Sequence, residues 1–133
     1  MKETKFRAWD SINKIWIDPF KLILMRCGSV QSVESLDGEI YGTHQVFLNQ
    51  YTGLKDRNGK EIYEGDVVER KEETCAHGVE AANYIVIWSD DDIGFKLKTI
   101  YSPIFVKDAA VSVFLEDDSE IIGNIYENPK LCQ

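Results

Sequence analysis

The stretch that decides the fold runs from Gln50 to Val68 and reads QYTGLKDRNGKEIYEGDVV. It places three turn signals between short apolar segments. Asn58-Gly59 is the strongest of them, because a type I′ hairpin turn requires positive φ at both central positions. Gly53 and Gly65-Asp66 mark two further reversals, and Val67-Val68 begins a new strand. This pattern is typical of a small β-barrel with tight turns.

Short strands are expected on both sides of this stretch. Residues 2–18 predict a hairpin with turn residues at 10–13, and residues 44–51 predict a strand. Residues 84–88 (YIVIW) predict a buried strand, and residues 93–98 alternate apolar and other side chains as a half-buried strand does. A last pair of strands is expected at 111–115 and 121–126, and the charged segment 71–82 is expected to be an exposed loop. With no convincing helical period, the sequence predicts an all-β protein.

Three short blocks of the chain resemble the YopX family of phage and prophage proteins. They are residues 5–10 (KFRAWD), the stretch from 50 to 68, and residues 122–129 (IGNIYENP). They lie in the family's order and span nearly the whole chain. The resemblance implies a bacteriophage or prophage accessory protein whose C-terminal part is an SH3-like β-roll. The family has no established catalytic residues, so the resemblance implies none here.

The expected fold is therefore mainly β, an SH3-like β-roll or barrel with an N-terminal β-hairpin extension. The best boundary lies near Asn49. It separates an N-terminal β/loop region, residues 1–49, from an SH3-like barrel with a short C-terminal tail, residues 50–133. A chain of 133 residues with 44% hydrophobic and 29% charged residues has the composition of an ordinary soluble domain.

The cysteines and the N-terminus indicate the cellular compartment. The chain has three cysteines (Cys27, Cys75 and Cys132), which is an odd number, and no C-x-x-C motif. The first residues lack the apolar segment of a signal peptide. Reduced thiols in the cytoplasm of a bacterial host cell are therefore expected, rather than a disulfide framework.

Motifs for catalysis and for metal or cofactor binding are missing from the sequence. Cys75-Ala76-His77 supplies one pair of ligands, whereas a structural zinc site usually needs two pairs. The acidic runs at 90–92 and 116–118 lack the ligand spacing of an EF-hand. There is no nucleophile elbow, no P-loop and no G-x-G-x-x-G. We therefore expect no enzyme, no cofactor and no metal.

A basic hairpin tip is the candidate nucleic-acid contact. Lys55, Arg57 and Lys60 surround the predicted Asn58-Gly59 turn. The formal net charge of −8 works against phosphate binding, and so do the acidic residues of the same hairpin, Asp56, Glu61 and Glu64. A nucleic-acid-associated small barrel is therefore the alternative function, together with an acidic decoy that occupies a DNA-binding protein of the host.

Protein binding is the function that we expect first. Phe6, Trp9 and Trp16 place a large apolar area on a short N-terminal hairpin. Because a lone hairpin is marginal in water, it must dock on its own barrel or on a neighbouring molecule. We therefore expect a non-catalytic accessory protein that binds a protein partner or forms a homo-oligomer, with no membrane segment. The partner, the stage of phage biology and the number of subunits stay open.

Overall fold

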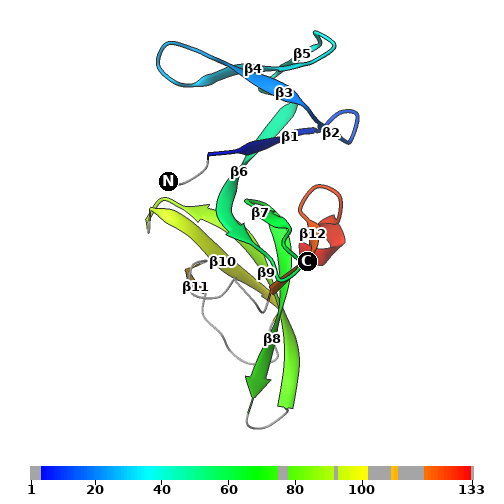
Figure 1. The fold of residues 1–133 in the computed structure, drawn as a ribbon, viewed down its shortest axis with the longest axis vertical. Helices are drawn as coiled ribbons and strands as arrows, with labels where there is room; N and C mark the ends of the chain where they lie inside the picture. The colour runs from blue at the N-terminus through cyan, green and yellow to red at the C-terminus, as the bar shows by residue number, and fades with distance from the viewer. Residues whose placement is uncertain (1–3, 75–77, 92, 102–108, 111–118, 133) are drawn as a thin grey trace. The chain divides into compact units, whose positions relative to one another are not determined.

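The computed structural model describes residues 4–74, 78–91, 93–101, 109–110 and 119–132. In these residues the protein is mainly β, with three antiparallel sheets, no α-helix and one short 3₁₀ helix, η1 (Pro129–Cys132) (Figure 1). The prediction of a mainly β fold is confirmed. No helix in these ranges is long and apolar enough to cross a membrane. The chain divides into an N-terminal unit, Lys5–Gln50, and a C-terminal unit that begins at Tyr51.

The N-terminal unit contains two small antiparallel arrangements of strands. In the first, β1 (Phe6–Asp10) lies between β2 (Ile15–Ile17) and the first half of β6 (Val46–Lys55). In the second, β4 (Val30–Ser35) lies between β3 (Phe20–Leu24) and β5 (Ile40–Gly42). The predicted N-terminal hairpin is thus the pair β1–β2, and β6 joins it from more than 35 residues further along the chain.

The core of the N-terminal unit follows from the alternation of side chains along these strands. Ala8, Ile17, Val33 and Val46 are buried together, and half-buried side chains pack around them, namely Phe20, Leu22, Tyr41 and Leu48. An apolar hollow of about 90 Å³ lies at one edge of this core, between residues of β4, β5 and β6. Because Ala8 of β1 belongs to this core, the residues at even positions of β1 face the core and those at odd positions face away from it.

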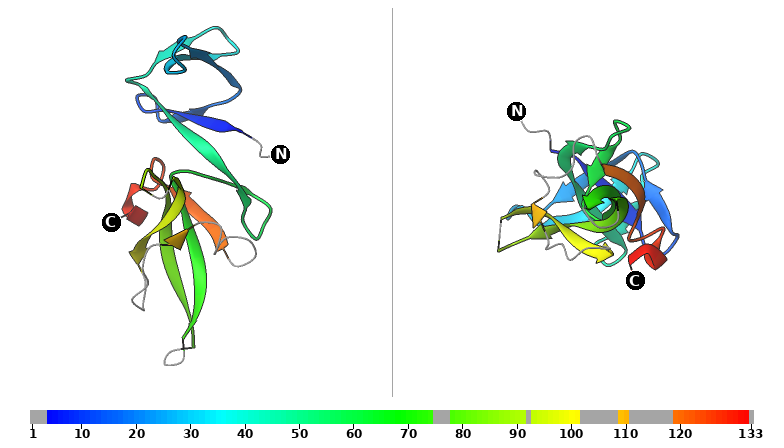
Figure 2. Two further views of the ribbon diagram at one scale, coloured as in Figure 1. Left: turned by 90° about the vertical axis from the view of Figure 1, so that its left-hand side faces the viewer. Right: turned by 90° about the horizontal axis from the view of Figure 1, so that it is seen from below.

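The C-terminal unit is built on a curled half-barrel of five antiparallel strands (Figure 2). Their order across the sheet is β11 (Ala109–Ala110), β10 (Gly94–Tyr101), β9 (Gly78–Ser89), β8 (Asp66–Thr74) and β12 (Ser119–Asn124). The second half of β6 pairs with β7 (Glu61–Tyr63). The division between the units falls within β6, whose first half belongs to the N-terminal unit.

One face of the half-barrel holds the second core. Its buried residues are Ile62, Val68, Ala82, Tyr84, Val86 and Leu97. Each large apolar side chain that moves from water into such a core contributes ~1.5–3 kcal/mol. The cluster therefore holds β7, β8, β9 and β10 together, although these strands are up to 40 residues apart in sequence.

Two local predictions are wrong. The segment 71–82 is predicted to be a loop, but residues 71–74 and 78–82 are paired strands of a long hairpin arm, in which Lys71 pairs with Ala81 and Thr74 with Gly78 (Figure 1). The charged residues do not indicate a loop here, because the two strands of the arm are held by backbone hydrogen bonds between them. Residues 84–88 do form a strand, but Trp88 at its end is 42% exposed rather than buried. The strand expected at 111–115 lies outside the described residues.

The turn at Asn58-Gly59 lies where the sequence predicts it, but its type is different. Gly59 has a φ of 80°, whereas Asn58 does not have a positive φ, so the turn is not type I′. The N–H of Gly59 donates to the carbonyl of Asp56, and the N–H of Asp56 donates to the carbonyl of Lys60. A four-residue turn that ends in a left-handed glycine therefore connects β6 to β7.

Candidate functional site

A row of aromatic side chains crosses the strands β2, β1 and β6 of the N-terminal unit. Trp9 pairs in register with Trp16 on one side and with Phe47 on the other. Because neighbouring residues in a strand point to opposite faces, this row lies on the face opposite to the core residue Ala8. The rings of Trp9 and Trp16 meet edge to face, with 4.9 Å between their centroids. We call Trp9, Trp16 and Phe47 the aromatic row.

Arg7 fixes one end of the aromatic row. Its guanidinium lies 4.5 Å from the centroid of a Trp16 ring, and its Nε donates a hydrogen bond of 3.2 Å to Oδ1 of Asn49. A cation over an indole contributes ~0.5–1 kcal/mol at an exposed site. Arg7 thereby ties β1 to both neighbouring strands and holds the indole of Trp16 against the sheet.

The members of the aromatic row differ in exposure. Trp9 at the centre is 5% exposed, Trp16 is half-buried and Phe47 is 49% exposed. Contact with another molecule would therefore be made by the two flanking rings. Phe6 is also exposed, but it pairs with Gln50 on the other face of β1. The structure thus brings Trp9 and Trp16 together and places Phe6 apart from them.

Phe47 was missed as a candidate from the sequence, although a signal was present. It alternates with Val46 and Leu48 in a predicted strand, which places it on the face away from the core. What the sequence does not show is that β6 pairs with β1, because the paired residues are about 40 positions apart. Only that pairing puts Phe47 beside Trp9.

A buried carboxylate, Asp10, holds the turn that connects β1 to β2. Its Oδ1 accepts hydrogen bonds from the N–H groups of Ile12 (3.0 Å) and Asn13 (3.2 Å) and from Nε2 of Gln45 (2.9 Å). Its Oδ2 accepts a bond of 2.7 Å from Nδ2 of Asn13. Burial works to raise the pKa of Asp10, but these bonds, led by Gln45, lower it from 3.8 to about 2. Ionised Asp10 therefore stiffens the hairpin that carries two members of the aromatic row.

The predicted basic tip is exposed but closely accompanied by acids. Nη2 of Arg57 lies 2.5 Å from Oε2 of Glu120, in an ion pair between the β6–β7 turn and β12. Lys55 stands opposite Glu61 in the β6–β7 register. Lys60 is exposed on the other side of the turn. The structure thus brings Lys55, Arg57 and Lys60 to one turn, together with two carboxylates.

Asp56 at the base of this tip is a structural residue. It is buried, its Oδ1 accepts hydrogen bonds of 2.9 Å from the N–H groups of Asn58 and Lys60, and its Oδ2 accepts one of 3.1 Å from the N–H of Ile121. Burial works to raise the pKa of Asp56, but the N–H groups of Ile121, Lys60 and Asn58 hold it below its ordinary value. The turn is therefore fastened to β12 by an ionised side chain.

The remaining candidates for chemistry are few in the described part of the chain. No group of three or more His, Cys, Asp or Glu residues there could hold a metal ion. Cys75-Ala76-His77 and the acidic run 116–118 lie outside the described residues. The thiols of Cys27 and Cys132 are free, the first exposed and the second half-buried.

Taken together, these features define a mainly β protein of two small units with exposed aromatic surface. Residues 5–133 match the family described as YopX protein, and the chain belongs to that family. Its fold is similar to the crystal structure of protein EF1440 from Enterococcus faecalis, with a TM-score of 0.67, 24% identity and 100% of both chains covered. No curated protein matches the sequence. At this level of identity the likeness to EF1440 concerns the fold alone.

Proposed function

We propose that this YopX-family protein is a non-catalytic phage or prophage accessory protein of the bacterial cytoplasm that acts by binding protein. The first partner to test is a second copy of itself. We propose also that the curled half-barrel is SH3-like, which its strongly bent, tightly turned antiparallel sheet supports. The absence of catalytic motifs from the sequence supports a binding role rather than a reaction.

The observation that carries the proposal is the aromatic row. Phe47 is half-exposed and Trp16 half-buried, and they flank a Trp9 that is held rigidly by both neighbouring strands. Large aromatic rings on a stiff sheet give contact area with little loss of conformational entropy, which is why such residues dominate protein interfaces. A surface of this kind suits a protein partner.

A sheet edge beside the aromatic row adds to this surface. Among the described strands, β2 is the outermost of its sheet, and Ile15 on it is exposed. The backbone groups on the outer side of such a strand can pair with a strand of another molecule. Two copies that pair along β2 would bring their Trp16 residues close to each other.

The charge of the basic tip gives less support to nucleic-acid binding. Of its three cations, Arg57 is engaged by Glu120 and Lys55 faces Glu61. Nucleic-acid binding relies on Lys and Arg side chains that neutralise phosphates, and these carboxylates compete with phosphate for the same cations.

Light scattering coupled to size-exclusion chromatography tests self-association. Phe47→Thr removes the exposed ring and keeps a residue that favours strands. Leu36→Thr is the matched control, because Leu36 is an exposed apolar residue in the turn between β4 and β5. We expect the mass of the wild type and of the control to rise above the monomer mass with concentration, and that of Phe47→Thr to stay monomeric. A wild type that is monomeric from micromolar to millimolar concentration would contradict self-association.

A further inference from the structure

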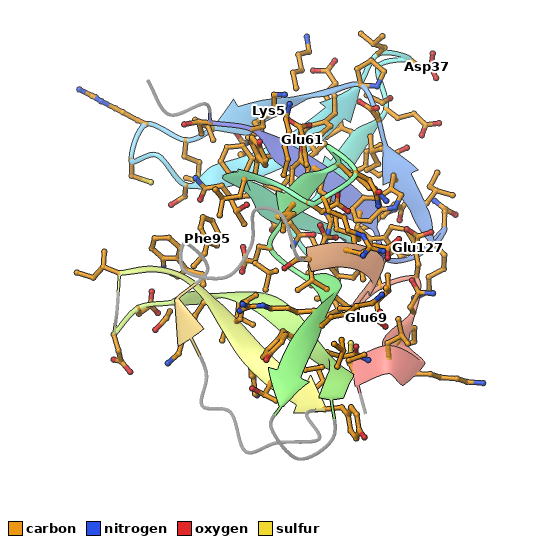
Figure 3. The ribbon with its side chains drawn as sticks, turned by 60° about the horizontal axis from the view of Figure 1, so that its bottom comes forward. Lys5, Asp37, Glu61, Glu69, Phe95 and Glu127 are labelled. Atoms are coloured by element: carbon orange, nitrogen blue, oxygen red, sulfur yellow. The ribbon has the colours of Figure 1, made fainter. Side chains whose placement is uncertain are left out.

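The apolar face of the half-barrel that carries the core continues to an exposed end at the β9–β10 turn. Val86 and Leu97 pair in register and are fully buried. The next pair on the same face is Trp88 and Phe95. Trp88 is 42% exposed, and Phe95, labelled in Figure 3, lies near the end of this hairpin. The core therefore leads into an aromatic pair near the tip of the sheet, in which Phe95 is half-buried against the core and Trp88 is exposed.

The indole of Trp88 is held in a fixed position with a carboxylate at its edge. Its ring meets that of Phe95 edge to face, with 5.1 Å between centroids and 81° between planes. Its Nε1 donates a hydrogen bond of 3.0 Å to Oδ1 of Asp90. Asp91 follows and is exposed. A partly exposed indole thus lies next to the carboxylate of Asp90, and the exposed Asp91 follows in the same turn.

Ile93 adds an apolar side chain with an unusual backbone. It is 81% exposed, and its φ is 49°, in the left-handed region that β-branched residues rarely adopt. Such a conformation costs ~1–3 kcal/mol. Asn or Gly would fit this turn position better. The isoleucine side chain is exposed, so no burial within the protein offsets the cost of its backbone conformation. Contact with another molecule would give this side chain the burial that the turn does not provide.

We propose that Trp88, Asp90, Asp91 and Ile93 form a docking surface for a segment of another protein that carries an apolar side chain next to Lys or Arg. We call these four residues the β9–β10 tip. An Arg or Lys of the partner lies on the face of Trp88 and pairs with Asp90, which joins a cation–π contact to an ion pair. The apolar side chain of the partner packs on Ile93.

Charge selects this partner over a nucleic acid. Asp90 and Asp91 repel phosphate, and the net charge of −8 draws basic segments towards the protein from a distance. Lys96 is not part of this surface, because it pairs with Ile87 on the opposite face of the sheet from Phe95. The surface shares no residue with the aromatic row, so it adds a second partner to the proposed function.

Fluorescence anisotropy with labelled peptides tests the proposal. The first peptide alternates Arg and Leu, the second has Gln in place of each Arg, and the third has Ser in place of each Leu. The binding variants are Ile93→Asn, which suits a positive φ, and the double variant Asp90→Asn with Asp91→Asn. Their matched controls are Leu36→Asn and Asp37→Asn, exposed positions in the β4–β5 turn. Circular dichroism establishes that each variant is folded.

We expect the Arg–Leu peptide to bind the wild type and both controls alike. Binding should weaken with salt and fall by about tenfold or more in each tip variant. The proposal is overturned if the Gln peptide or the Ser peptide binds as tightly, if no peptide binds, or if all variants bind equally.

A fourth peptide separates a foreign partner from a second copy. Residues 20–26 (FKLILMR) also combine apolar and basic side chains. If this peptide binds the β9–β10 tip and the Arg–Leu peptide does not, the occupant is a second copy and the proposal of a foreign partner is wrong. Phe47→Thr should leave Arg–Leu peptide binding unchanged, so this proposal and the self-association of the aromatic row can fail independently.

Discussion

Replacement of Asp10 by Asn tests how the hairpin below the aromatic row is held. The asparagine keeps one acceptor oxygen but loses the charge and presents an N–H₂ group where a carboxylate oxygen accepted. Hydrogen bonds to a charged group contribute ~1.5–3 kcal/mol each, and the three bonds that reach Oδ1, from the N–H groups of Ile12 and Asn13 and from Gln45, would become bonds to a neutral oxygen. The bond from Nδ2 of Asn13 to Oδ2 is lost, because the new N–H₂ group faces another donor there. We expect the free energy of unfolding to fall by ~2–4 kcal/mol at neutral pH.

The pH dependence of this loss gives a sharper result. The pKa of Asp10 is about 2 in the folded protein, and its ordinary value, which applies to the unfolded chain, is 3.8. A lowered folded pKa stabilises the protein above the unfolded pKa, and this stabilisation is lost as the pH falls through the folded pKa. The difference in stability between the wild type and Asp10→Asn should therefore be constant above about pH 5 and shrink steadily towards about pH 2.

Urea unfolding at a series of pH values measures this difference. Trp9 and Trp16 lie beside the turn and report unfolding of the N-terminal unit by fluorescence. Asp37→Asn is the control, since Asp37 is exposed in another turn of the same unit, and its effect should stay within ~0.5 kcal/mol. A difference for Asp10→Asn below that value at neutral pH, or one that does not change with pH, would refute the reasoning.

Three further substitutions probe the C-terminal unit by thermal unfolding. Asp56→Ala leaves three backbone N–H groups without their acceptor and should lower the free energy of unfolding by ~2–4 kcal/mol. Asp91→Ala on an exposed turn is the control and should change it by less than ~0.5 kcal/mol. Equal effects of the two substitutions would contradict the role of Asp56. Gly59→Val forces a β-branched residue to a φ of 80° and should cost ~1–3 kcal/mol, and an unchanged melting temperature would show that the turn can change its conformation freely. Gly123→Ala puts a Cβ 2.6 Å from Oδ1 of Asn128, so we expect the free energy of unfolding to fall by ~1–3 kcal/mol and the NMR resonances of η1 to shift. Unshifted η1 resonances would argue against this contact.

The sequence predicts the local features of this fold well. Turn residues and alternation give the β class, the N-terminal hairpin and the position of the turn at residues 58–59. The type of that turn is decided by a buried side chain, since Asp56 bonds the N–H groups of Asn58 and Lys60. Nothing in the pattern Asn-Gly indicates that a preceding aspartate will be buried.

The non-local features could not be predicted, because they depend on pairings between distant strands. Phe47 joins Trp9 only because β6 pairs with β1, and Arg57 meets Glu120 across 63 positions of sequence. Residues 71–74 and 78–82 are paired by cross-strand hydrogen bonds, and residues 71–74 (KEET) contain no apolar side chain from which a strand could be predicted. Trp88 looks like a core residue in sequence, but it stands at the exposed end of a buried face.

Hydrogen exchange at low and at high protein concentration tests most directly whether the aromatic row is a protein-binding surface. It reports on each backbone N–H, so it locates an interface as well as detecting it. If two copies meet at this face, exchange at residues 15–17 and 46–48 should slow as concentration rises, while the turn at 36–38 stays unchanged. Equal exchange at both concentrations throughout 15–17 and 46–48 would contradict self-association through the aromatic row.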